Sequence, residues 1–267
     1  KKFGFGEITG INLPGEATGI TRDLSQWKKV SLGSISIGHE ISTTPLQLVR
    51  AVSAIANGGY LMKPTIVKQA VHEGKIIKSF SPEIVREVLS QKTVQAMKEI
   101  LTQAVNYGTG KKASIPGYLV GGKTGTAQKI DPDTKKYSAN NFVASFVGFV
   151  PVENPKLTIL VMIDEPRGIH WGGSVAAPVF REIAKKALRH LNVPSKMNRI
   201  HTLSIKSNKS NKSNKSNKIN HRTLNAGLMT NFFDDNINLN ISKSIDKFLS
   251  RVIAGLKNHY WEKDKNA

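Results

Sequence analysis

The tripeptide Ser-Asn-Lys is repeated four times from Ser207 to Lys218, and this repeat limits what the 267-residue chain can fold into more than any other feature. It holds no apolar side chain, so burial cannot offset the entropy of ordering it. Before residue 192, by contrast, apolar segments alternate with Gly, Pro and Asn turns. We therefore predict a folded part over 1–191, a disordered basic linker over 192–220 and a separate tail over 221–267.

The tail carries a strong helical pattern. Apolar residues from Ile241 to Leu256 recur every three to four positions, with Lys243, Lys247 and Arg251 among the polar ones. This pattern predicts an amphipathic helix. Such a helix could bind a membrane surface or a partner, or pack on its own domain, and the pattern favours neither alternative.

The net charge of +20 is spread along the chain, since residues 1–191 hold 25 Lys and Arg against 14 Asp and Glu. No nucleic-acid-binding motif accompanies it. A membrane surface or a cell-wall polymer explains the charge equally well, and we expect no nucleic-acid partner. The absence of cysteine excludes disulfides and thiolate ligands, and the seven histidines lack metal-ligand spacing. We therefore expect no metal and no cofactor. No run reaches the roughly 18 apolar residues of a membrane-spanning helix.

Periodicity and turn residues predict an α+β fold built on an antiparallel sheet flanked by helices. The first predicted helix has Thr43 and Thr44 as cap candidates and ends at Gly58. The last predicted helix has an apolar stripe of Val179, Ile183, Ala187 and Leu191. In chain order, the predicted elements are a helix over 45–57, a hairpin of 65–71 and 75–80, a helix over 93–105, strands within 118–130, 142–150 and 157–163, and a helix over 178–191.

The stretch Gly117–Lys129, GYLVGGKTGTAQK, carries the most chemistry and has two incompatible interpretations. Gly117 through Thr124 fits the phosphate-loop pattern G-x-x-x-x-G-K-[ST], and Ile159–Glu165 is an apolar strand that ends in acids. A phosphate loop, however, needs a strand before it and a helix that begins at Lys-Thr. Here a polar, Pro-terminated segment precedes it and Gly125 follows at once.

The alternative makes 119–128 a strand whose Lys-Thr-Gly-Thr residues border a site. Glycine lets another backbone approach closely, and a lysine with two hydroxyls can hold a carboxylate. Lys-Thr-Gly is also an element of penicillin-binding proteins and class A β-lactamases. We favour this strand over the phosphate loop.

Five segments in order then resemble the class B penicillin-binding proteins, the D,D-transpeptidases that cross-link peptidoglycan. They cover about 190 residues, from Phe3 to Leu191, and together are far more specific than one motif. The matching segments are 3–19 (FGFGEITGINLPGEATG), 36–59 (SIGHEISTTPLQLVRAVSAIANGG), 121–129 (GGKTGTAQK), 141–151 (NFVASFVGFVP) and 172–184 (GGSVAAPVFREIA).

This resemblance implies part of a β-lactamase-like transpeptidase fold and roles for four residues. Lys123 would supply positive charge and a hydrogen bond to a Ser-x-Asn element. The hydroxyls of Thr124 and Thr126 would hold the terminal carboxylate of a D-Ala-D-Ala stem peptide or of a β-lactam. The Thr126 backbone N–H would serve the oxyanion hole, and Gly125 would keep the strand edge clear. An ordinary strand glycine is the alternative for Gly125.

By the same resemblance, the nucleophile of the Ser-x-x-Lys element and the Ser-x-Asn element both precede the segment that begins at Phe3. The patterns at Ser25–Lys28, Ser138–Asn140 and Ser244–Lys247 stand in the wrong order, so we treat them as chance matches. We expect an incomplete transpeptidase that is inactive alone, from a membrane-anchored parent with its catalytic domain outside the cytoplasmic membrane. A non-catalytic relic that binds membrane or cell-wall machinery is the second hypothesis, and a nucleotide hydrolase is the third.

The resemblance also places the family's first two strands and its central helix before Lys1. The strand that begins at Leu157 would then lack a neighbour and leave a partly apolar edge unpaired. We therefore expect the isolated chain to fold marginally or to aggregate, with a broad thermal transition in circular dichroism. A sharp, cooperative melt would contradict this expectation.

Overall fold

The computed structural model describes residues 1–36 and 38–195. Lys1–Val193 forms one compact unit. The linker predicted after residue 192 and the helix predicted at 241–256 lie almost wholly or wholly outside the described residues, so the boundaries at 191 and 220 stay predictions. No helix in the described part of the chain is long and apolar enough to cross a membrane.

A three-stranded antiparallel sheet forms the centre of the unit. It consists of β5 (Gly121–Ile130), β6 (Tyr137–Val150) and β7 (Leu157–Asp164), in the order β5-β6-β7. Gly121 lies opposite Phe149, and Val150 lies opposite Leu157. The three predicted strands are confirmed, although β5 begins at Gly121 and β6 begins at Tyr137, five residues earlier than predicted.

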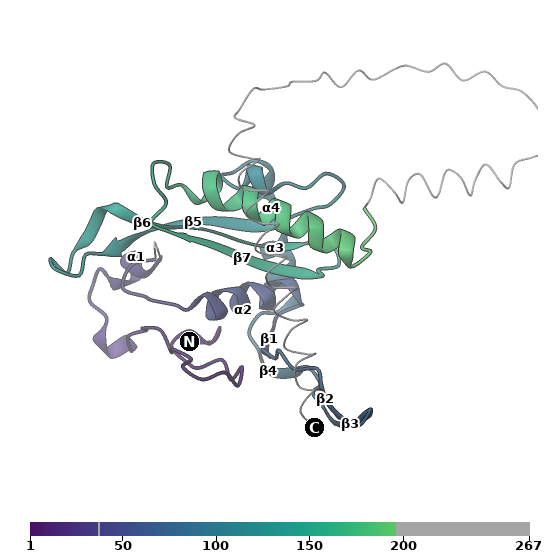
Figure 1. Ribbon diagram of the computed structural model, residues 1–267. Coiled ribbons are helices and arrows are strands. Elements are labelled where there is room, and N and C mark those ends of the chain that lie inside the picture. The colour runs from purple at the N-terminus through teal and green to yellow at the C-terminus, as the bar shows by residue number, and fades with distance from the viewer. Residues whose placement is uncertain (37, 196–267) are drawn as a thin grey trace, which may run out of the picture. The chain divides into compact units, whose positions relative to one another are not determined.

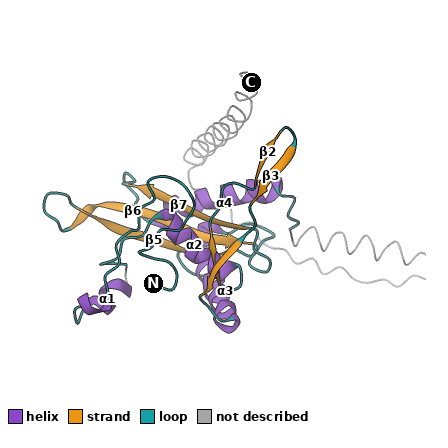
Figure 2. Ribbon diagram, turned by 90° about the horizontal axis from the view of Figure 1, so that it is seen from below, coloured by secondary structure: helices purple, strands orange, loops and turns teal. Residues whose placement is uncertain are grey.

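Helices cover both faces of this sheet, as Figures 1 and 2 show. One face carries α4 (Gly172–His190), and α2 (Pro45–Ala56) lies against β6 and β7 on the other. α3 (Gln91–Asn106) packs beside β5. The two predicted helices before the sheet are therefore confirmed, and the fold class is α+β with an antiparallel sheet.

Two phenylalanines of β6 pack against neighbouring glycines of β5, one ring on each side. A β-carbon at Gly121 would lie 2.8 Å from the Phe149 ring, and one at Gly122 would lie 2.6 Å from the Phe146 ring. Phe146 belongs to the core under α4 and meets Phe180 edge to face at 4.7 Å. Phe149 belongs to the smaller core formed with Ile55 of α2. The two glycines thus let both cores close on the same strand.

The predicted start of the last helix was wrong. α4 begins at Gly172, and Pro178 lies inside it. The predicted stripe was also displaced, because the fully buried residues are Ala176, Ala177, Phe180, Ala184 and Leu188. Val179 and Ile183 are only partly buried, and Leu191 is 51% exposed. The buried Phe180, Ala184 and Leu188 each lie one residue after the predicted Val179, Ile183 and Ala187.

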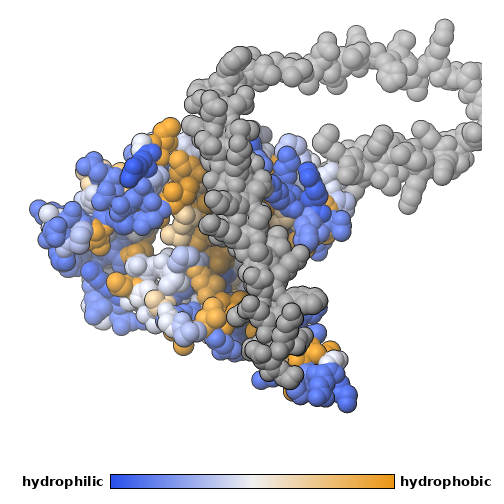
Figure 3. Space-filling view, in the orientation of Figure 1, coloured by the Kyte–Doolittle hydropathy of each residue, from blue (hydrophilic) through white to orange (hydrophobic). Residues whose placement is uncertain are grey.

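The hairpin predicted around Glu73 and Gly74 is confirmed as β2 (Gln69–His72) paired with β3 (Lys75–Ser79). It projects from the unit, where hydrophobic and hydrophilic surface lie side by side (Figure 3). The sequence patterns missed the shorter elements. These are η1 (Leu24–Gln26), α1 (Ser31–Ser36), β1 (Tyr60–Lys63), β4 (Glu83–Glu87) and η2 (Lys111–Ala113), with β1 and β4 paired antiparallel.

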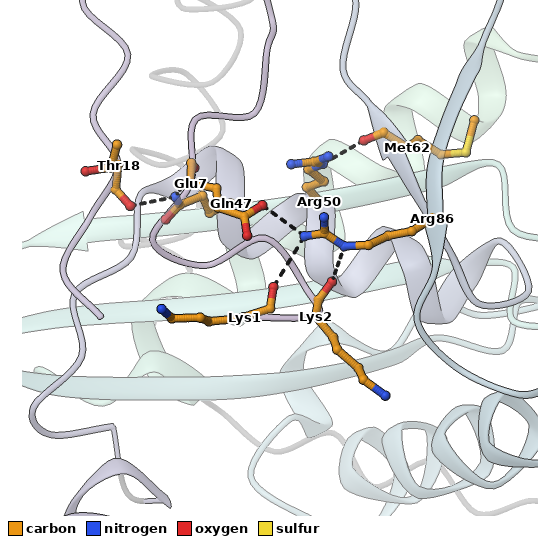
Figure 4. Close-up of polar contacts among 8 residues, drawn as sticks. All are labelled: Lys1, Lys2, Glu7, Thr18, Gln47, Arg50, Met62 and Arg86. Carbon is orange, nitrogen blue, oxygen red and sulfur yellow. Dashed lines mark hydrogen bonds and ion pairs between the residues drawn. The ribbon is translucent and has the colours of Figure 1, made fainter. Parts of the chain in front are cut away.

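A buried glutamine joins the N-terminal segment to α2 (Figure 4). The Gln47 side-chain amide donates to the carbonyl oxygens of Glu7 at 2.7 Å and of Thr18 at 2.8 Å. Its own oxygen accepts the N–H of Thr44, whose hydroxyl caps the helix in return. Thr44 is therefore the cap that the sequence predicted.

Two further contacts fix the same segment. Arg86 of β4 donates to the carbonyl oxygens of Lys1 and Lys2 and pairs with Glu7 (Figure 4). The Glu16 carboxylate accepts the backbone N–H of Thr9 at 2.7 Å and of Gly10 at 3.2 Å. The Thr9 side chain beside this carboxylate, and then the backbone N–H groups of Thr9 and Gly10, lower the pKa of Glu16 below its ordinary value.

Replacing Gly122 by alanine should unfold the unit. The new β-carbon would press on Phe146 and on the Val147 carbonyl at 2.8 Å, and overpacking of this kind costs about 3 kcal/mol. We expect Gly122→Ala to lose the near-ultraviolet circular dichroism of the native chain. Gly33→Ala in α1, where the added β-carbon would meet no neighbouring atom within 4 Å, should keep it. A native spectrum for Gly122→Ala would refute the packing argument.

Removing the Gln47 amide should free the N-terminal segment. Gln47→Ala deletes three hydrogen bonds worth about 1 kcal/mol each, so exchange at the amides of Thr9 and Ile20 should accelerate about a hundredfold. Hydrogen exchange followed by mass spectrometry or NMR measures this. The exposed Gln103 of α3 gives a matched control, Gln103→Ala, that should change neither amide. Unchanged exchange in Gln47→Ala would show that other contacts hold the segment.

Candidate functional site

Lys123, Thr124, Gly125 and Thr126 all lie on β5. The strand continues unbroken to Ile130, and no helix begins at Lys123-Thr124. Among the described residues, β6 is the only strand that pairs with β5. A phosphate loop needs a helix N-terminus at this point, so the structure excludes the phosphate-loop interpretation of this stretch. The four residues instead border one edge of the sheet.

Lys123 and Thr124 belong to a short chain of hydrogen bonds. The Lys123 ammonium donates to the Thr124 carbonyl at 3.0 Å and to the Thr124 hydroxyl at 3.3 Å. The Thr124 hydroxyl is in turn 2.7 Å from the Thr109 hydroxyl. No carboxylate of the described chain forms an ion pair with Lys123. Its positive charge therefore lies exposed beside two hydroxyls.

Thr126 joins this edge to the start of α4. Its hydroxyl oxygen accepts the N–H of Gly172 at 3.2 Å. The residue at the N-cap position, Trp171, makes no side-chain cap. Thr126 thus satisfies one of the backbone N–H groups in the first turn of α4 that have no acceptor within the helix. The Thr126 hydroxyl hydrogen has no acceptor among the described residues and can donate elsewhere.

Paired glycines let the first turn of α4 lie directly on the sheet. A β-carbon at Gly172 would be 2.2 Å from the Ser145 carbonyl and 2.4 Å from the Gly125 carbonyl. One at Gly173 would be 2.3 Å from the Thr109 carbonyl and 3.3 Å from Thr124. The helix start, the Thr109 loop and the β5 edge are therefore packed as one rigid arrangement.

Gly125 has a packing partner of its own. A β-carbon at Gly125 would lie 2.5 Å from the Ser145 hydroxyl on β6. Ser145 lies opposite Gly125 in the strand register. This contact supports the alternative that Gly125 is an ordinary strand glycine required by packing. The absence of a side chain at Gly125 also leaves the strand edge clear, so the two roles are compatible.

The acids that the nucleotide hypothesis used bind another lysine. Lys129, at the far end of β5, lies 2.7 Å from the Glu165 carboxylate and 3.0 Å from that of Asp164. These hydrogen bonds to Glu165 and Asp164 raise the pKa of Lys129 above its ordinary value. The two acids therefore tie β5 to the end of β7, and neither of them pairs with Lys123.

Two of the three chance matches to Ser-x-x-Lys or Ser-x-Asn, those at Ser25 and Ser138, lie within the described residues, and each serine has a local setting. Ser25 lies in the exposed 3-10 turn η1. The Ser138 hydroxyl accepts the backbone N–H groups of Asn140 and Asn141, which is a local structural use. Ser244 lies outside the described residues. No cluster of three metal-ligating side chains occurs in the described part of the chain.

Sequence reasoning missed three residues that shape the site, namely Thr109, Ser145 and Gly172. Thr109 stands between two glycines after α3, a position that turn rules assign only to a loop. Ser145 and Gly172 were within matched segments, but their contacts are set by strand register and by helix packing. The one available signal was the Gly172-Gly173 pair, which indicates a close backbone approach.

Comparison with known proteins fits this arrangement. Residues 1–185 match the family model for the penicillin binding protein transpeptidase domain. The chain is 42% identical over 203 residues to Stage V sporulation protein D of Bacillus subtilis, covering 75% of this chain and 31% of that protein. It is 36% identical over 197 residues to the peptidoglycan D,D-transpeptidase FtsI of Buchnera aphidicola, covering 72% and 33%.

A solved structure shares the same fold. Apo penicillin binding protein 3 of Mycobacterium tuberculosis superposes with a TM-score of 0.67 at 36% identity, over 73% of this chain and 46% of that one. The chain therefore spans about a third of the length of its curated relatives and under half of that solved chain. The resemblance and fold inferred from the sequence are confirmed: this chain belongs to the penicillin-binding protein transpeptidase domain family.

Proposed function

We propose that this chain is the C-terminal part of a peptidoglycan D,D-transpeptidase and supplies the substrate-holding edge of its active site. The observation that carries the proposal is that Lys123, which pairs with no carboxylate of the described chain, lies on the same strand edge as the Thr124 and Thr126 hydroxyls. Relatives over the same residues include a protein named peptidoglycan D,D-transpeptidase. An unpaired cation with two hydroxyl groups suits a carboxylate ligand.

Each residue has a distinct part in this proposal. The terminal carboxylate of a D-Ala-D-Ala stem peptide, or that of a β-lactam, accepts hydrogen bonds from Thr124 and Thr126. Lys123 adds positive charge to the same edge and meets the Ser-x-Asn element of the complete protein. The Thr126 N–H is one oxyanion donor, which stabilises the charge that develops on the attacked carbonyl.

Preorganisation supports this assignment. Thr126 is held by the Gly172 N–H and Thr124 by the Thr109 hydroxyl, so neither side chain has to be ordered when a ligand arrives. The Thr126 hydroxyl keeps its hydrogen for the ligand. We include β-lactams among the proposed ligands because a solved relative, Mycobacterium tuberculosis penicillin binding protein 3, is complexed with ampicillin.

The serine nucleophile belongs to the part of the family domain that precedes residues matching Phe3. Acyl transfer therefore requires that part as well. Its serine attacks the carbonyl of the D-Ala-D-Ala amide, the amide C–N bond breaks, and the terminal D-Ala leaves as the acyl-enzyme ester forms. A complete protein of this kind acts at the outer side of the bacterial cytoplasmic membrane, where its peptidoglycan substrate lies.

Labelling by a fluorescent penicillin tests the proposal. Residues 1–267 alone should show no covalent label. Joined to an upstream transpeptidase segment that bears Ser-x-x-Lys and Ser-x-Asn, they should be labelled. Lys123→Ala should slow labelling about a hundredfold or more, because one oxyanion-site or charge contact contributes that much.

Lys129→Ala is the matched control. It removes a lysine from the same strand that binds Asp164 and Glu165 instead, and labelling should change little. Folded joined protein that labels equally with Ala at position 123 would remove Lys123 from the site. Labelling of residues 1–267 alone would place a nucleophile within this chain and overturn the assignment.

A further inference from the structure

The β2–β3 hairpin, residues 69–79, is separate from the rest of the unit. Neither strand packs against another helix or strand of the described chain, and every residue of both strands is exposed. A two-stranded hairpin with no third layer is only marginally stable in water. A partner that covers it would contribute the missing burial.

Large aliphatic side chains gather on this hairpin without a core beneath them. Val71 is 51% exposed, Ile76 is 59% exposed and Ile77 is 68% exposed. The register shifts beside Val71 and Ile76, which marks a bulge in the ribbon. Figure 3 shows the resulting mixture of apolar and polar surface on the projecting hairpin. Exposed apolar strands of this kind are typical of recognition surfaces.

The charge of the hairpin is positive. Lys68, Lys75 and Lys78 form no ion pair with a carboxylate of the described chain. The one acid of the hairpin, Glu73, lies at the turn beside His72, 3.9 Å away. Lysines at both ends of β3 would repel the same strand of a second copy, whereas an acidic strand would be attracted.

The outer edge of β3 has unused main-chain groups. β2 is its only strand partner in the described part of the chain. Burial of such an edge in lipid would leave its N–H and C=O groups unpaired. An extended polypeptide satisfies those groups by adding a strand.

We propose that the β2–β3 hairpin is a docking site for an acidic, extended segment of a partner protein. The segment pairs with the free edge of β3, covers Ile76 and Ile77, and places carboxylates near Lys75 and Lys78. This surface is distinct from the β5 edge, so the proposal does not depend on the transpeptidase assignment.

A defined peptide tests the docking. The probe is a fluorescent peptide of about eight residues that alternates glutamate with valine, titrated with the full chain at low ionic strength. We expect a dissociation constant below about 1 mM, and about tenfold weaker binding for Lys75→Glu combined with Lys78→Glu. Ile76→Thr combined with Ile77→Thr should weaken binding as well, while keeping strand propensity.

Two controls separate strand addition from simple charge attraction. Lys111→Glu with Lys112→Glu makes the same charge change on the exposed turn η2 and should leave binding intact. The peptide with alternate amides N-methylated has the same charge but cannot pair as a strand, and it should lose binding. Equal binding of the methylated peptide would overturn the proposal. So would no binding at millimolar peptide, or hairpin-dependent binding only to phosphatidylglycerol vesicles.

Discussion

The packing of two phenylalanine rings against two adjacent glycines is the constraint on which the rest of the structure depends. Phe149 and Phe146 lie three residues apart on β6 and occupy the positions that side chains at Gly121 and Gly122 would fill. One ring closes the core with α2 and the other closes the core with α4. Since both cores meet at this point of β5, the residues that follow, Lys123 to Thr126, are fixed at the sheet edge.

The helix on one side of the sheet and the candidate site are parts of the same contact. The first two residues of α4 are glycines because backbone atoms of Gly125, Ser145 and Thr109 occupy the space where side chains would lie. The N–H of Gly172 then reaches the Thr126 hydroxyl. The site therefore gains rigidity from long-range packing more than from its local strand.

Local patterns predicted the elements whose signals are contained within one segment. Thr44 caps α2 in both sequence and structure, and the Glu73-Gly74 turn correctly located a hairpin. Local patterns failed where a feature of the fold depends on a residue far away in the chain. α4 has no side-chain cap from its N-cap residue, and Thr126, 46 positions away, accepts its first N–H. The position of the Lys-Thr-Gly residues on a strand could be predicted from the sequence. Thr109 and Ser145 could not be predicted as their neighbours, because packing of segments far apart in the chain brings them there.

The Thr126 hydroxyl oxygen accepts the Gly172 N–H and also lies at the proposed ligand site, and this double use restricts how the position can vary during evolution. Any replacement must supply an acceptor for the Gly172 N–H, whatever ligand the strand edge binds. Serine keeps that oxygen, whereas valine keeps the shape and leaves the helix end unsatisfied. The next two residues, Ala127 and Gln128, are exposed, and no described hydrogen bond joins them to α4. Substitutions along this strand should therefore be confined at 126 to residues with a side-chain acceptor, and they should be tolerated more freely immediately after it.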